Sequence, residues 1–192
     1  MEPSTKISPS PSPSFHINTI LECDLHSIPQ TSTDVRILWS TICTQYFPSP
    51  RFIQSIEKQV TVDTVLSHEG SFFECLVVRS CNAEVPDDSK DIPIFVIVYK
   101  DASQDTQVGW TQATTQMLEY CRESLSGDKR VYGAVAIGTK VRLFCCSYPV
   151  INPSIEDDFE LKLEDDADRR GLEEVLKVIR RRGRKWAVSM HR

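Results

Sequence analysis

Glycine is scarce in this chain, at 7 of 192 residues. A loop that cradles a nucleotide phosphate is rich in glycine, and neither G-x-x-x-x-G-K-(S/T) nor G-x-G-x-x-G occurs. The G-x-S-x-G elbow of serine hydrolases and the H-E-x-x-H helix of zinc proteases are also missing. These absences exclude the common nucleotide-binding, serine-hydrolase and zinc-protease motifs.

Metal-ligand spacings are missing as well. The seven cysteines include no C-x-x-C pair, and the four histidines are scattered along the chain. Several cysteines lie inside apolar runs, which is typical of buried free thiols that pack as small hydrophobes. This usage favours a reducing, intracellular compartment, either cytoplasm or nucleus.

Long apolar runs and a strong net charge are also absent. No run approaches the length that spans a bilayer, and the N-terminus lacks the pattern of a secretory signal. The net charge of -5 gives no general attraction to nucleic acid or to an anionic membrane. We therefore expect no membrane partner, and binding to nucleic acid would need a local basic patch.

The composition predicts one domain between two tails. Alternating Ser-Pro within residues 1–14 has nothing to bury and cannot form regular structure. We expect a disordered N-terminal tail and leader over residues 1–31. A single α/β domain ending in an amphipathic helix would cover residues 32–183, and a basic C-terminal tail residues 184–192.

Hydrophobic periodicity predicts the order of the elements. The expected helices cover about 33–46, a short stretch at 52–58, 108–125 and 165–182. The expected strands cover 59–66, 72–79, 92–99 and 159–163, with a hairpin of 132–137 and 141–146. The run 92–99 is apolar nearly throughout, as in a strand buried on both faces. The fold class is thus α/β, with a central mixed sheet flanked by helices.

The order helix, three strands, helix, hairpin resembles the PD-(D/E)XK nuclease-like family, fungal type. The residues that carry the resemblance are the strand IFVIVYK ending at Lys100 and the helix ATTQMLEY with Gln116. The following YGAVAIGTKVRLF is similar to the next strands of that family. The resemblance covers about residues 33–147 and implies a restriction-endonuclease-like core.

The resemblance also implies a site. In the family two carboxylates hold Mg²⁺, a lysine stabilises the charge of the transition state, and a glutamine helps to position them. Lys100 and Gln116 match the catalytic positions, and Asp63 and Glu74 are the candidate metal ligands. The family acid two residues before the lysine is replaced here by Val98, which cannot bind a metal. We therefore expect a degenerate site with no cofactor, and Mg²⁺ if the protein is active.

Each of these residues also has a simpler interpretation. Lys100 and the adjoining Asp101 end a strand and begin a loop, Gln116 lies beside an apolar stripe, and Asp63 is a surface residue. Glu74 lies between Phe73 and Cys75, so it faces solvent or needs a partner. Lys100 is a plausible partner, and a Glu74–Lys100 pair is either a remnant site or a structural salt bridge.

The basic run 180–185 has three interpretations. It is a nuclear-localisation patch, a phosphate-binding patch, or the solvated end of a helix whose dipole favours cations there. The last is preferred. Trp186 is the one neighbouring aromatic residue that stacking with a base would use.

Three functions stay open at this stage. The first is a nuclease-like domain with a decayed metal site that acts by binding a protein or nucleic-acid partner. The second is an active Mg²⁺-dependent nuclease with a rearranged site. The third is an accessory protein of a metabolic pathway, and the fold class alone does not separate the three.

Overall fold

The computed structural model describes residues 31–60, 72–81, 91–124, 130–147 and 160–189. Its elements are α2 (Ser32–Tyr46), β1 (Phe52–Val60), β2 (Phe72–Ser80), β3 (Ile92–Lys100), η1 (Ala102–Gln104), α3 (Gln107–Ser124), β4 (Arg130–Ile137), β5 (Lys140–Ser147), β6 (Glu160–Lys162) and α4 (Asp166–Ser189). The expected N-terminal tail, most of the 59–66 strand and Asp63 lie outside the described residues.

The strands form one mixed sheet in the order β1-β2-β3-β4-β5-β6. All neighbours are antiparallel except β3 and β4, which are parallel. A parallel pair needs a crossover connection, and α3 supplies it. The prediction of an α/β fold with a central mixed sheet flanked by helices is confirmed.

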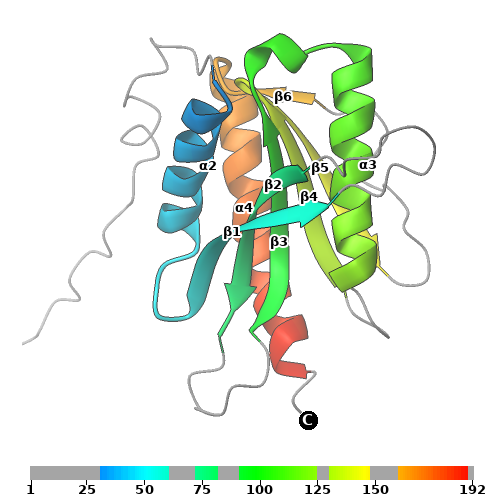
Figure 1. The fold of residues 1–192 in the computed structure, drawn as a ribbon. Helices are drawn as coiled ribbons and strands as arrows, with labels where there is room; N and C mark the ends of the chain where they lie inside the picture. Colours follow the sequence, from blue (N-terminus) through cyan, green and yellow to red (C-terminus); the bar gives the residue numbers. More distant parts are fainter. Residues whose placement is uncertain (1–30, 61–71, 82–90, 125–129, 148–159, 190–192) are drawn as a thin grey trace, which may run out of the picture.

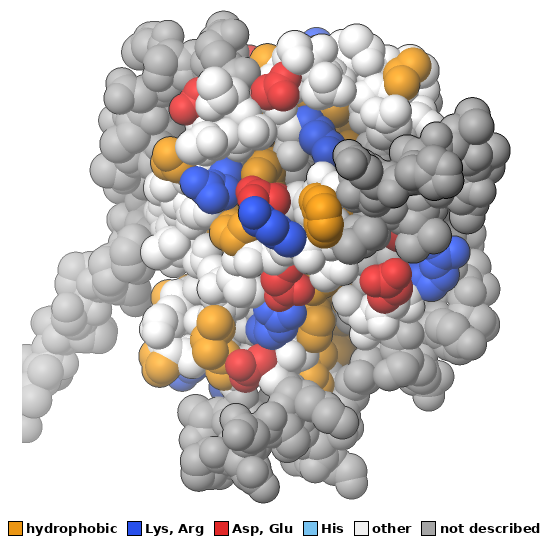
Figure 2. Space-filling model, viewed as in Figure 1, with side chains coloured by type: hydrophobic (Ala, Val, Ile, Leu, Met, Phe, Trp, Pro, Cys, Tyr) orange, Lys and Arg blue, Asp and Glu red, His pale blue; other side chains and the backbone are white. Residues whose placement is uncertain are grey.

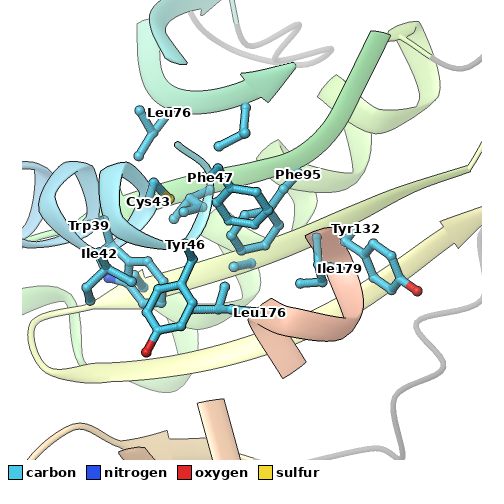
Figure 3. Packing of buried hydrophobic residues seen from close by; sticks show 14 of the residues in the cluster. Trp39, Ile42, Cys43, Tyr46, Phe47, Leu76, Phe95, Tyr132, Leu176 and Ile179 are labelled. Carbon is cyan, nitrogen blue, oxygen red and sulfur yellow. The ribbon is translucent and has the colours of Figure 1, made fainter. Parts of the chain in front are cut away.

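Helices cover both faces of the sheet, α2 and α3 on opposite sides (Figure 1). The apolar cluster on the first face joins α2 and α4 to the sheet. In Figure 3, side chains of α2, such as Trp39 and Tyr46, gather with Phe95 of the sheet and Leu176 of α4. The second cluster joins α3 to the other face. Because β3 contributes to both clusters, its continuous apolar run is explained by burial on two sides.

The structure corrects the helix expected at 52–58. These residues form the edge strand β1, paired with β2 from Phe52 to Val60. Phe52, Ile53 and Ile56 have helical spacing, but only Phe52 is buried, whereas Ile53 and Ile56 are exposed. At the edge of the sheet, both faces of β1 carry polar and apolar side chains. The alternation of polar and apolar residues that is typical of a half-buried strand is therefore weak here.

The structure also extends the last helix. We expected α4 to end near Arg182 and residues 184–192 to form a tail, but α4 continues to Ser189. The later turns remain helical because Ala187 packs into the core and Trp186 against it. The basic run is therefore fixed on a packed helix.

Other local predictions agree with the structure. The Gly138–Thr139 turn joins β4 to β5, and Gly138 has a φ of 57°, which glycine adopts without strain. Cys43, Cys75, Cys121 and Cys146 are buried free thiols. Within the described part of the chain, none of the helices has the length and apolarity needed to cross a bilayer.

Candidate functional site

Lys100 is the last residue of β3, at the end of the sheet where α3 begins. Val96 and Val98 belong to the apolar cluster under α3, so by alternation Lys100 lies on that face too. Its side chain has neither a hydrogen bond nor an ion pair with any residue the structure describes. Burial lowers the pKa of the Lys100 ammonium, and Asp101 offsets this in part.

Hydrogen bonds hold the turn after Lys100. The carbonyl oxygen of Lys100 accepts from the backbone N–H of Gly138 at 3.2 Å. The carboxylate of Asp101 caps η1 by accepting from the backbone N–H of Ser103 at 3.0 Å. Asp101 is thus engaged in its own turn, as expected for a residue that ends a strand, and does not replace the missing acid.

Gln116 lies on α3, which covers the same face of the sheet as Lys100. Its side-chain Oε1 is buried and accepts no hydrogen bond within the described part of the chain. A buried amide oxygen without a donor is costly, about 1–3 kcal/mol. Lys100 and Gln116 therefore lie on one face of the sheet, and neither the Lys100 ammonium nor Gln116 Oε1 has a hydrogen-bond partner among the described residues.

Val98 lies two residues before Lys100, where the resemblance leads us to expect an acid, and its surroundings are apolar. It is 0% exposed, and its partner across the β2–β3 ladder is Cys75, also 0% exposed. Magnesium requires several oxygen ligands in near-octahedral geometry. Two adjacent apolar side chains do not provide them, so this part of the face does not fit a Mg²⁺ site.

Glu74 lies on the opposite face of the sheet from Lys100. Its Oε2 accepts a hydrogen bond at 2.9 Å from the hydroxyl of Tyr99, a residue of the α2–α4 cluster. Its Oε1 lies 3.6 Å from Nζ of Lys58. The expected Glu74–Lys100 pair is therefore wrong, because neighbouring strand residues such as Tyr99 and Lys100 point to opposite faces.

Two of the four candidate residues thus share a face, namely Lys100 and Gln116. Glu74 is separated from them by the sheet, and Asp63 lies outside the described residues. Among the residues that are described, no group of three His, Cys, Asp or Glu side chains is placed to hold a metal ion.

A second polar cluster lies between β1, β2 and α3, and the sequence analysis missed it. The carboxylate of Glu57 forms an ion pair with the guanidinium of Arg79 and accepts a hydrogen bond at 2.8 Å from the hydroxyl of Tyr120. Arg79 also donates to the hydroxyl of Ser55 at 2.6 Å. Ser55 and Glu57 alternate along β1. Polar residues at every second position would have indicated one face of a strand, but residues 52–58 were interpreted as a helix.

The electrostatics of this cluster are those of a structural ion pair. Burial acts to raise the pKa of Glu57, but hydrogen bonds from Tyr120 and Arg79 outweigh it and hold the pKa below 4.5. The carboxylate therefore stays charged and engaged at neutral pH. Such a group ties β1 and β2 to α3 and is not poised to exchange a proton near pH 7.

Glu57→Gln is expected to lower the free energy of unfolding by about 1–2 kcal/mol at pH 7. Because the folded pKa is depressed, this stabilisation is complete above pH 4.5 and is lost as the pH falls through the folded value. Urea unfolding of both proteins at pH 7 and on acidification measures the difference. The control is Glu123→Gln, which removes the same charge from an exposed position of α3. An equal loss of unfolding free energy in the two variants would contradict the assignment of Glu57 to a structural ion pair.

Compared with protein-family models, with curated proteins and with solved structures, the chain gives no match.

Proposed function

We propose that this chain is a non-catalytic, PD-(D/E)XK nuclease-like domain that acts by binding a macromolecular partner. The support from the sequence is the motif around Lys100 and Gln116. The support from the fold is the order α2, three strands, α3, hairpin, with the parallel β3–β4 pair connected by α3.

The observation that carries the proposal is the burial of Val98 against Cys75. An active site of this class needs carboxylates beside the lysine, and here the two facing strand positions are apolar. Lys100 and Gln116 remain on the correct face without their acidic partners. This is the arrangement expected of a fold that was retained after its metal site was lost.

Titration calorimetry with Mg²⁺ and Mn²⁺, together with cleavage assays on plasmid DNA and RNA, tests the proposal. We expect no saturable metal binding by the full chain and no metal-dependent cleavage. Because Asp63 is the remaining candidate carboxylate from the sequence, Asp63→Ala is measured alongside. Metal binding that is lost in Asp63→Ala, or cleavage that is lost in Lys100→Ala, would establish an active nuclease instead.

A further inference from the structure

The last turns of α4 carry a dense group of cations. Five of the six residues from 180 to 185 are basic, and all five are exposed: Arg180, Arg181, Arg182, Arg184 and Lys185. None of them forms an ion pair with a described residue, and the sequence has no Asp or Glu after Glu174. By contrast, Lys177, one turn earlier, is paired with Glu173 and Glu174.

Tertiary contacts add a cation from the sheet to this group. The indole of Trp186 stacks on the ring of Tyr132, with centroids 5.1 Å apart. The guanidinium of Arg130, an exposed residue at the start of β4, lies 5.7 Å from the centroid of the same indole. We call the side chains of Arg130 and of the five cations at 180–185 the basic surface.

The basic surface differs in its charges from the face of the molecule that Figure 2 shows. On the face shown in Figure 2, Lys and Arg side chains are interspersed with Asp and Glu side chains. The whole chain carries a net charge of -5, so the field at the end of α4 opposes that of the molecule. A concentration of exposed cations that have no acidic partner among the described residues, on an acidic protein, marks a local anion-binding surface.

We infer that the basic surface binds the phosphodiester backbone of a nucleic acid, by charge and without reading the base sequence. Five of its six cations are arginines, whose planar guanidinium matches phosphate oxygens in a bidentate manner. Because Tyr132 and Arg130 already contact the Trp186 indole, that ring is held in place and is not left to stack on a base.

A lipid surface fits these observations less well. A membrane-bound amphipathic helix inserts its apolar face into the lipid. The apolar residues of α4, such as Leu176, Ile179 and Ala187, are buried against the sheet instead. Among the side chains that the structure describes in these turns, the exposed side offers charge without an apolar anchor.

The basic surface lies far from Lys100, so nucleic-acid binding there would not involve the nuclease-like site. Tyr132 pairs with Phe95 near the start of β3, whereas Lys100 ends that strand. Five residues of strand place the two about 16 Å apart along β3, and they lie on opposite faces of the sheet. A phosphate bound at the basic surface therefore does not contact Lys100. The inference rests on the proposed function in that it names the partner of a non-catalytic domain.

The test measures fluorescence anisotropy of a labelled DNA duplex and of a labelled single-stranded RNA, titrated with the full chain in EDTA. The variant is Arg181→Gln/Arg184→Gln/Lys185→Gln, which keeps helix propensity and leaves Arg130, Arg180 and Arg182 in place. We expect wild-type binding that weakens with salt between about 50 and about 200 mM, and a loss of roughly tenfold or more in the variant. In the variant, the slope of the logarithm of the binding constant against the logarithm of the salt concentration should be smaller in magnitude by about 2–3.

The matched control is Arg122→Gln/Lys162→Gln/Arg170→Gln. It removes three exposed cations elsewhere and also changes the net charge from -5 to -8 (-5 - 3). We expect the control to bind close to the wild type. Equal losses in both triple variants would overturn the inference, because bulk charge would then explain the binding.

Two further outcomes would also overturn it. One is binding to phosphatidylserine vesicles but not to nucleic acid. The other is binding that Lys100→Ala removes and the α4 triple variant keeps, which would place the nucleic acid on the nuclease-like face. Cleavage or metal binding would instead contradict the proposed function alone, so the two failures are distinguishable.

Discussion

Val98→Glu is expected to lower the free energy of unfolding by about 3–5 kcal/mol at pH 8, because it buries an uncompensated charge. Val98 is fully buried among apolar side chains under α3, with Cys75 opposite. Burial disfavours the charged form, so the pKa of the introduced carboxyl will lie above its value in the unfolded chain. The loss therefore grows as the pH rises, and it should be smaller at pH 5 than at pH 8.

Urea unfolding at the two pH values measures this effect, with Val98→Ala as the control. The alanine variant removes apolar contacts without adding charge, so its loss should not depend on pH in this range. An ion pair between the new carboxylate and Lys100, two residues away on the same face, would reduce the loss below this range. A Val98→Glu variant as stable as the wild type at pH 8, and further stabilised by Mn²⁺, would show that this position accommodates a carboxylate together with a metal ion. That result would contradict the packing argument.

Gly183→Leu is expected to destabilise the protein by about 3 kcal/mol, the upper end of the usual cost of overpacking, because the contact it would enter is already close. A Cβ atom at Gly183 would lie 2.9 Å from the Cβ of Ile94, an atom next to the backbone of β3 that has little freedom to move. The glycine within the basic run is thus what lets α4 approach the sheet. Displacing the helix should also separate Trp186 from Tyr132, which intrinsic tryptophan fluorescence will report.

Gly171→Ala is the control on the same helix. Among the described residues, a Cβ atom there meets only Leu161, at 3.9 Å, which is an ordinary contact. The substitution should stabilise the protein by about 0.5–1 kcal/mol through helix propensity and reduced entropy of the unfolded chain. Destabilisation by both substitutions would indicate that α4 does not pack as described. Destabilisation by Gly183→Leu together with stabilisation by Gly171→Ala would support the described packing.

Much of the fold was predictable because burial patterns are local in sequence. The helix beginning near Asp34, the buried run of β3 and the hairpin around Gly138 each carry their own signal. The edge strand β1 was not predictable in this way. Its exposed Ile53 and Ile56 imitate a helical spacing, and only pairing with β2 fixes these residues as a strand.

The candidate site was likewise predictable only in the features that lie within one strand. By itself the sequence determined that an apolar residue, Val98, stands two residues before Lys100, since both positions lie within one strand. Only the tertiary structure decided that Glu74 belongs to the opposite face, that Cys75 fills the place beside Val98, and that Arg130 joins the cations of α4. The physical reason is that alternation gives the relative faces within a strand, whereas the register between strands and the docking of a helix set which faces and charges meet.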